Sequence, residues 1–434
     1  MADDTREINQ YLRGNDTDPS MFIHTADLHL APRSATISKR DPKTSRLIRD
    51  LDMENAFIRS VDATLSMSPL PSAYVVAGDI FDTYRGSSDA FLAVVKQFRR
   101  LRAAGIEVLS IAGNHHTPTN RLKTPMFEML RGVFSNDEGT TLAYDDIEHR
   151  RVGDIEYVLL PHLRCLNGDF EEKDLAPTTD AGYAVLIVHG VAAGDPSLSQ
   201  MDEVKEIPIA PWILDMGWDY IAFGHYHKPG WIHGREGKAA YSGSLENTVI
   251  SGPDVCMRRG PVRVDMSKPA TERFDMLEQS VRDIVVLPDI DVTGSEVNAE
   301  ELDNQICELL LDSNIDGAIV RHTVRGVTRA LLKSMSRRSF ASVAPSALYI
   351  KTNFETVPEV EYERVADLAE KSEDGTADIG GVPADEGAPD DERGGAFRTL
   401  DGEVDLVVDQ MTAKGVIAEH KAEQVRELLH QLLQ

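Results

Sequence analysis

The stretch "SIAGNHHTP" (residues 110–118) decides how this chain folds and where its chemistry lies. An apolar run ends at Gly113, and Asn114, His115 and His116 follow without a gap. An amide and two imidazoles at the end of a buried strand need polar partners, because buried polar groups are rarely left unpaired. The meaning of this cluster therefore depends on whether other strands also end in polar groups.

Residues 21–265 alternate apolar runs with amphipathic or charged runs, which is the pattern of an α/β fold. Near-continuous apolar runs predict strands that are covered on both faces, at 21–26, 73–78, 106–113, 155–161, 183–190 and 218–224. Residues 88–105 predict an amphipathic helix that ends at Gly105.

Five of these predicted strands deliver nitrogen or oxygen ligands at their carboxyl ends, the edge of an α/β sheet where sites form. The candidates are Asp27 and His29, Asp79, Asn114, His189, and His225 and His227. Carboxylates, imidazoles and an amide suit divalent Mn, Fe or Zn. Seven ligands are too many for one ion with an open position, whereas two ions that share a carboxylate suit phosphoester hydrolysis.

The order of motifs makes the pattern more specific. D-x-H in "HTADLHL" (24–30) is followed by G-D-x-x-D in "VVAGDIFD" (75–82), then G-N-H, H-G, G-H-x-H in "FGHYHKP" (223–229), and "YSGSLE" (241–246). Over residues 21–250 this order resembles the calcineurin-like metallophosphoesterases, and within them the DNA repair nuclease subunits of the SbcD and meiotic-recombination-eleven type. The resemblance implies a four-layer αββα sandwich, a small α+β capping domain and a C-terminal helical hairpin.

The resemblance also implies roles for single residues. One ion would be held by Asp27, His29, Asp79 and His227, and the other by Asp79, Asn114, His189 and His225, with Asp79 as the bridge. Manganese is the expected metal, and a metal-bound hydroxide would attack phosphorus. His115 would protonate the leaving oxygen or stabilise the charged transition state.

Two positions depart from the family pattern. His116 stands where the family commonly has an acidic residue, so it cannot orient the catalytic imidazole as a carboxylate would. We expect it behind the ligands or at the surface. Asp82 stands where close relatives often place a histidine that orients His115, and we expect it to support the ligands, with a helix N-cap as the alternative.

The chain divides by composition into five parts. We predict a polar tail (1–20), the phosphoesterase domain (21–275), a β-α-β-α-β capping module (280–357), an acidic linker (358–400) and a helical segment (401–434). The module carries basic residues that offer phosphate contacts: Arg321, Arg325, Arg329, Lys333, Arg337 and Arg338. A merely solvated basic helix face is the alternative.

Partners and compartment follow from the resemblance and from composition. The apolar stripe of 401–434 predicts a docking segment, and the family implies an SMC-like ABC ATPase of the SbcC type as its partner, besides DNA and a second copy of the chain. A net charge of −27 argues against a uniformly basic nucleic-acid binder, so we expect weak DNA binding by this subunit alone. Three separated cysteines, no apolar run of eighteen residues and no signal peptide predict a cytoplasmic, nucleoid-associated protein without a membrane anchor.

The leading hypothesis is therefore a two-metal DNA nuclease subunit of an end-processing complex, with 3′-to-5′ exonuclease activity on duplex ends and endonuclease activity on single strands. The alternative enzyme is a calcineurin-like phosphodiesterase that acts on a small nucleotide or a phosphoprotein. A third hypothesis, a scaffold subunit with little catalysis, is supported only by His116.

Overall fold

The computed structural model describes residues 17–33, 37–117, 124–178, 180–193, 208–250, 257–336, 340 and 343–357. No helix within these ranges has both the length and the apolar character that a bilayer-spanning segment needs. The predicted linker and helical segment (358–434), most of the predicted tail, and Arg337 and Arg338 lie outside the described residues.

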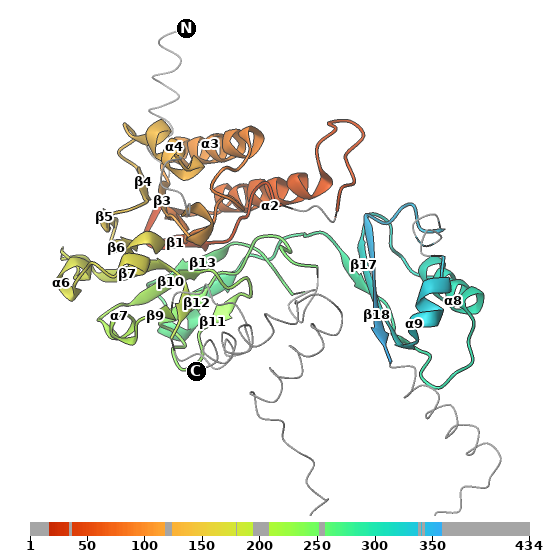
Figure 1. Ribbon diagram of the computed structural model, residues 1–434. Helices are drawn as coiled ribbons and strands as arrows, with labels where there is room; N and C mark the ends of the chain where they lie inside the picture. The colour runs from red at the N-terminus through yellow and green to blue at the C-terminus, as the bar shows by residue number, and fades with distance from the viewer. Residues whose placement is uncertain are drawn as a thin grey trace, which may run out of the picture. The chain divides into compact units, whose positions relative to one another are not determined.

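Two six-stranded sheets form the centre of the domain that was predicted to be a phosphoesterase (Figure 1). The first has the order β14-β13-β1-β2-β3-β4, with β1 Thr17–Thr25, β2 Leu70–Val76, β3 Glu107–Ile111, β4 Thr140–Ala143, β13 Val262–Asp265 and β14 Phe274–Met276. The second has the order β11-β12-β10-β7-β6-β5, with β5 Glu148–Val152, β6 Ile155–Leu160, β7 Tyr183–His189, β10 Tyr220–Gly224, β11 Gly230–Trp231 and β12 Ala239–Tyr241. A short pair, β8 (Val191–Ala192) and β9 (Pro208–Ile209), stands apart.

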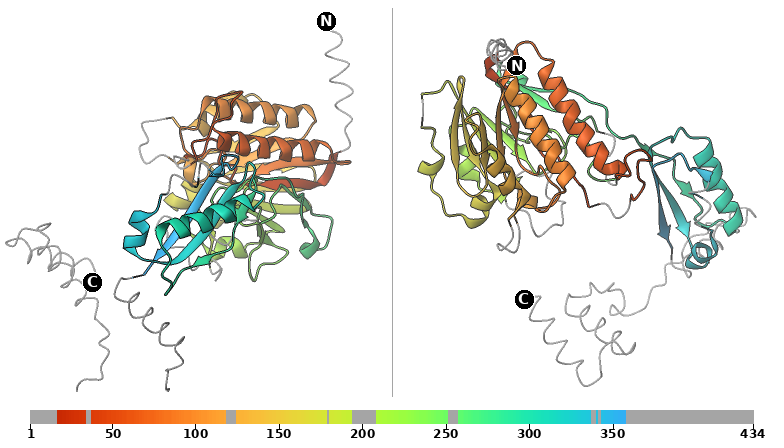
Figure 2. Two further views of the ribbon diagram at one scale, coloured as in Figure 1. Left: turned by 90° about the vertical axis from the view of Figure 1, so that its right-hand side faces the viewer. Right: turned by 90° about the horizontal axis from the view of Figure 1, so that it is seen from above.

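Helices cover the outer face of each sheet, which gives the four layers that were predicted. The first sheet packs against α2 (Ile48–Leu65), α3 (Ser88–Ala103) and α4 (Met126–Phe134), and Figure 2 shows α2 and α3 side by side. The second packs against α5 (His162–Asn167), α6 (Glu172–Leu175) and α7 (Pro211–Asp215). Between the sheets, Phe22 meets Tyr157 and Tyr220 edge-on, at centroid distances of 5.4 and 5.8 Å. These aromatic contacts fix the two sheets against each other, and therefore fix their strand ends.

The small module follows as a parallel sheet with helices on one face. β17 (Ile319–Val327) pairs on one side with β15 (Ile284–Val286) and β16 (Ile290–Asp291), and on the other with β18 (Tyr349–Thr356). α8 (Ala299–Leu311) and α9 (Arg329–Ser334) pack on this sheet through Leu302, Ile306 and Leu331. Asn298 caps α8 by accepting hydrogen bonds from the amides of Glu300 and Glu301, as predicted.

The predicted α/β sandwich is confirmed, and its strands lie close to the predicted ranges. α3 begins at Ser88, and Gly105 just beyond its end has a φ of +85°, which favours glycine. The first strand starts at Thr17, inside the segment predicted as a polar tail. Thr17 and Asp18 pair with Leu70 and Pro71 of β2 through the backbone, so an apolar side-chain pattern was not needed there.

Candidate metal centre

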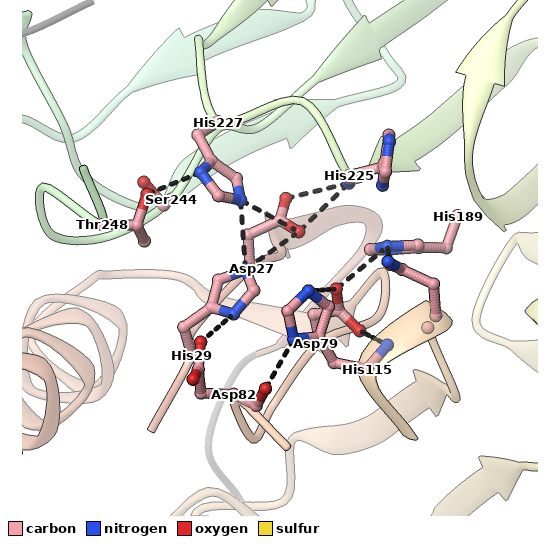
Figure 3. A network of polar contacts seen from close by, with 12 residues as sticks. Asp27, His29, Asp79, Asp82, His115, His189, His225, His227, Ser244 and Thr248 are labelled. Atoms are coloured by element: carbon pink, nitrogen blue, oxygen red, sulfur yellow. Dashed lines mark hydrogen bonds and ion pairs between the residues drawn. The ribbon is translucent and has the colours of Figure 1, made fainter. Parts of the chain in front are cut away.

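Five strand ends from the two sheets meet at one edge of the sandwich (Figure 3). β1, β2 and β3 are neighbours in the first sheet, and β7 and β10 are neighbours in the second. Of the six described non-glycine residues with positive φ, four are predicted site residues, namely Asp27 (53°), His29 (42°), Asp79 (49°) and His225 (101°). Strained backbone of this kind persists where the surrounding structure holds it, and it is concentrated at functional sites.

Glycines precede the ligand candidates because no side chain fits there. A Cβ on Gly113 would lie 2.2 Å from Asp79 Oδ1, and one on Gly78 would lie 2.2 Å from His189 Nδ1. A Cβ on Gly224 would lie 1.9 Å from the Ala77 carbonyl oxygen. The G-D, G-N and G-H pairs of the sequence therefore reflect close packing of the strand ends.

Asp27, His29 and His227 form the first group of ligand atoms. The Nε2 atoms of His29 and His227 lie 3.0 Å apart, and each lies 3.9 Å from Asp27 Oδ1. Metal–ligand bonds of about 2.0–2.2 Å place neighbouring ligand atoms about 3 Å apart or slightly more. The spacing therefore fits one ion.

The outer nitrogens of these imidazoles are fixed by partners. His29 Nδ1–H donates to the Asp82 carboxylate at 3.1 Å, and His227 Nδ1 lies 2.5 Å from the Thr248 hydroxyl. These partners direct both Nε2 atoms toward each other, and in neutral rings with Nδ1 protonated both Nε2 atoms are acceptors. Two acceptors that face each other at this distance repel unless a cation, either a proton or a metal ion, lies between them. The residues present therefore fit a metal ion.

A second set of acceptors lies around Asp79. His189 Nδ1–H donates to the Ala77 carbonyl at 2.8 Å, which directs Nε2 into the site, where it carries either a proton or, in the neutral ring, a lone pair for a metal ion. That Nε2 lies 3.2 Å from Asp79 Oδ2 and 2.9 Å from Asn114 Oδ1. Asp79 and His189 also group with Asp27, and Asp79 groups with His29 and His115, so Asp79 lies within reach of both sets.

The ionised carboxylate of Asp79 favours positive charge on the groups next to it. Burial would raise the pKa of the Asp79 carboxyl, but the charge and hydrogen bond of His189 hold it well below the usual range. Burial would lower the pKa of His189, but the charge of Asp79 raises it to about 9. Burial is the main reason why the pKa of His227 lies well below its usual value, so this ring is neutral and able to act as a ligand at neutral pH.

His115 has the geometry of a proton donor or phosphate contact. Its Nδ1–H donates to the Asp82 backbone carbonyl at 2.5 Å, and its Nε2 lies 4.0 Å from Asp79 Oδ2. Its side chain is 38% exposed, in contrast to the buried ligand candidates Asp27, His29, Asp79 and His189. Asp82 thus supports two histidines, His29 through its carboxylate and His115 through its main chain. Its other carboxylate oxygen accepts the Arg33 amide at 2.9 Å, in the loop after β1.

His116 points away from this centre. Its ring is fully buried between Phe81 and Phe127, and burial lowers its pKa to about 3. The amides of Phe81 and Gly113 approach its two ring nitrogens at 3.1 and 3.2 Å. A neutral imidazole accepts through only one nitrogen, so a histidine satisfies this position less fully than the carboxylate that the family pattern commonly has there.

The structure does not bring every predicted residue into the ligand groups. The ring of His225 lies beside that of His189, with centroids 5.3 Å apart, but none of the three groups includes it. Its backbone amide instead donates to Asp27 at 3.0 and 3.1 Å.

The basic residues predicted for DNA do not share one surface. Arg321 and Arg325 lie on β17, whereas Arg329 and Lys333 lie on α9. Arg325 is already paired with Asp289 at 2.8 Å and with Glu355 at 3.3 Å.

Three supporting residues were missed. Thr248 holds His227, and the buried Arg259 donates to the His227 carbonyl at 2.8 Å and to Ser244 Oγ at 2.7 Å. His162 follows β6, and its ring centroid lies 6.4 Å from that of His189. Only His162 had a signal in the sequence, because it directly follows the apolar run "VLLP" as the other site residues follow theirs.

Comparison with known proteins agrees with this geometry. Residues 20–229 match the profile of the calcineurin-like phosphoesterase family, a range that contains all seven ligand candidates and His115. This domain is a calcineurin-like metallophosphoesterase. The family is one of hydrolases that bind divalent metal ions, so the groups around Asp27 and Asp79 are candidates for that metal site.

The relatives narrow the type of metallophosphoesterase. The chain is 27% identical over 323 residues to the DNA double-strand break repair protein Mre11 of Haloferax volcanii, which covers 74% of this chain and 66% of that protein. It is 27% identical over 267 residues to Mre11 of Aeropyrum pernix, covering 57% and 58%. It is 28% identical over 230 residues to the uncharacterized metallophosphoesterase YhaO of Bacillus subtilis, covering 52% and 53%. The archaeal relatives support the Mre11 and SbcD type, although the chain spans little more than half the length of several of the curated relatives that it matches.

Proposed function

We propose that this chain is the two-metal-dependent nuclease subunit of a DNA end-processing complex of the SbcCD type. It would act as a 3′-to-5′ exonuclease on duplex ends and as an endonuclease on single strands. The observation that supports it most is the pair of ligand groups around Asp27 and Asp79, in which nitrogen and oxygen atoms suited to metal binding lie 2.9–3.2 Å apart. The names of the archaeal relatives support DNA as the substrate.

In this proposal the residues divide into two ligand sets that share Asp79. Asp27, His29 and His227 hold one ion with Asp79, and His189 and Asn114 hold the other with Asp79 and with His225 after a rotation of its ring. Two divalent ions, manganese as we propose, supply activation of a water molecule and neutralisation of phosphate charge.

The remaining residues orient the ligands or supply a proton. His115 Nδ1–H is held by the Asp82 carbonyl, so the exposed Nε2 is the atom that contacts the phosphate or the leaving oxygen. The Asp82 carboxylate fixes the ring of His29, and Thr248 fixes the ring of His227, so that both Nε2 atoms stay directed into the site. His116 takes no part in the reaction, because its ring is buried against Phe81 and Phe127.

The partner is also part of the proposal. We propose that residues 401–434, which lie outside the described residues, bind an SMC-like ABC ATPase subunit. Their deletion should then leave hydrolysis by the isolated chain unchanged and remove binding of the ATPase.

The test compares two substrates on one preparation. Protein stripped of metal with a chelator, and the same protein with manganese restored, are assayed on end-labelled duplex DNA and on bis-(p-nitrophenyl) phosphate, with metal content measured by mass spectrometry. We expect metal-dependent cleavage of both substrates and two ions per chain. Hydrolysis of the small ester without any DNA cleavage would favour the small-substrate phosphodiesterase, and hydrolysis of neither would favour the scaffold.

A further inference from the structure

One motif of the sequence has no role in the proposed metal centre. "YSGSLE" (241–246) ends β12 and begins a loop, residues 242–248, that forms neither helix nor strand. The loop ends at Thr248, whose hydroxyl lies 2.5 Å from His227 Nδ1, and Figure 3 shows Ser244 and Thr248 beside His227. Because the loop has no regular hydrogen-bond ladder, its shape depends on contacts with other segments of the chain.

The 242–248 loop also contacts the backbone of His227. The Ser244 amide donates to the His227 carbonyl at 3.2 Å, and a Cβ on Gly243 would lie 2.8 Å from that oxygen. Arg259 joins the two segments, because its Nη1 donates to the same carbonyl at 2.8 Å and its Nε donates to Asn247 Oδ1 at 2.7 Å. The ring and the backbone of this ligand candidate are therefore both held by one loop.

Glu246 anchors the loop inside the fold. It is 2% exposed, and its two carboxylate oxygens accept the Arg282 amide at 3.0 and 3.1 Å. The Asn247 amide donates to Oε1 at 3.0 Å, and Arg49 Nη1 lies 3.6 Å from the same oxygen. Burial of a carboxylate costs free energy unless its oxygens are hydrogen-bonded, so these contacts fix Glu246 and the loop with it.

Arg282 connects this anchor to the small module. Its carbonyl accepts Asn247 Nδ2 at 3.3 Å, so neighbouring loop residues hold both of its backbone polar groups. Its guanidinium donates to Asp52 on α2 at 3.0 Å and to the Gly317 carbonyl at 3.1 Å. Arg282 lies two residues before β15, and Gly317 lies two residues before β17. A continuous series of contacts therefore runs from the strands of the module to His227.

We propose that Glu246 is a positioning residue for the His227 ligand and couples that ligand to the start of the small module, an inference that rests on the metal-dependent function proposed above. Glu246 acts through the loop, because its carboxylate holds Asn247, and the next residue, Thr248, holds the His227 ring. Without this anchor the ring would be held less firmly, and manganese would bind less tightly. Because coupling between two sites is reciprocal, manganese at His227 should in turn strengthen the contact between Glu246 and Arg282.

The experiment compares two buried carboxylates in the full chain. Glu246→Gln replaces one acceptor oxygen by an amide group that cannot accept from Arg282 or Asn247. Glu156→Gln is the matched control, because Glu156 is 1% exposed and accepts the Thr178 amide at 2.7 Å. Glu156 lies at the amino end of β6, whereas the metal centre lies at the carboxyl ends of the strands. Manganese binding is measured by electron paramagnetic resonance, hydrolysis of bis-(p-nitrophenyl) phosphate by manganese titration, and stability by thermal unfolding without metal.

Glu246→Gln should weaken binding of one of the two manganese ions by about 10–100-fold, the usual effect of losing the support behind a metal ligand. Hydrolysis of the small ester should rise again as manganese approaches saturation, because neither a ligand nor the proton donor has been removed. Glu156→Gln should bind manganese as the wild type does, although both variants should lose stability because a buried hydrogen bond is weakened.

Hydrogen exchange in a peptide that contains the Arg282 amide tests the coupling. In the wild type and in Glu156→Gln, exchange should be slower with manganese than after chelation. Thr248→Val breaks the connection at its other end, between the loop and His227, and leaves the Glu246 carboxylate in place. In this variant manganese should bind more weakly and should no longer slow exchange at Arg282, so the proposal is tested even if Glu246→Gln does not fold.

Three results would overturn the proposal: wild-type manganese affinity in Glu246→Gln, equal weakening in Glu246→Gln and Glu156→Gln, or exchange at Arg282 that manganese does not change in the wild type. The second would show a general loss of stability rather than positioning. A wild-type chain that bound manganese but cut no DNA would contradict the nuclease function and leave this proposal standing, whereas one that bound no manganese would overturn both.

Discussion

The metal centre and the open face of the small module, the face that α8 and α9 leave uncovered and on which Arg321 and Lys351 lie opposite each other, both gather polar side chains, but in opposite physical settings. Asp27 and Asp79 are each 1% exposed, on strained backbone, among acceptors that require a cation. Arg321 and Lys351 are partly exposed on regular strands. Charges interact strongly in a dry site and weakly where water and salt screen them. Substitutions at the metal centre should therefore have large effects that salt does not weaken. Substitutions on the small sheet should have smaller effects that decrease as salt is added.

Asp79→Ala should have the largest effect, because Asp79 lies within reach of both acceptor groups. We expect hydrolysis to fall to the rate without enzyme, and the number of bound ions per chain to drop, as measured by mass spectrometry after gel filtration. Far-UV circular dichroism serves as the folding control. Wild-type metal content in this variant would contradict the shared position of Asp79.

His115→Ala should lower DNA cleavage by about 10²–10⁴-fold, the usual contribution of a proton donor. Metal content should be unchanged, because Nε2 lies at the exposed rim. The loss on bis-(p-nitrophenyl) phosphate should be much smaller, since p-nitrophenolate departs without a proton. His116→Gln is the matched control next to it: stability should fall, but the ratio of the two rates should not change. Equal losses on both substrates in His115→Ala would rule out its role as the proton donor.

Asp82→Asn separates the two supports that this residue gives. The amide no longer provides a charged acceptor for His29 Nδ1–H, so metal affinity should weaken by about 10–100-fold. The backbone carbonyl still holds His115, so at saturating manganese the ratio of DNA to small-ester cleavage should match the wild type. Manganese titration of both activities measures this. A change in that ratio would mean that the carboxylate also acts on His115.

The residues that the sequence identified are those whose chemistry leaves a local pattern. Asp27, Asp79, Asn114 and His189 each directly follow or end an apolar strand, and the structure brings them together. Parallel pairing places strand ends at a common edge, so a pattern in one dimension predicts convergence in three.

What the sequence could not supply depends on contacts made at a distance. Arg259 and Thr248 support His227 from segments without a motif, and nothing local distinguishes the buried Arg259 from its exposed neighbour Arg258. The division of basic residues between β17 and α9 also required the strand register, since β17 ends only two residues before the helix begins. From composition alone, the basic residues of β17 and α9 had been predicted as a single group of phosphate contacts.

Arg325→Gln should have the smallest effect, and it tests the exposed side of the comparison. Arg325 is 51% exposed and pairs with Asp289 and Glu355, and exposed ion pairs contribute about 0.2–1 kcal/mol each. Urea unfolding at low salt should show a loss within that range for each pair. In 1 M sodium chloride the Debye length is about 3 Å, so the loss should nearly vanish. A loss that persisted at high salt would mean that these contacts are packing rather than charge, and the module's open face would then resemble the dry metal centre more closely than its exposure indicates.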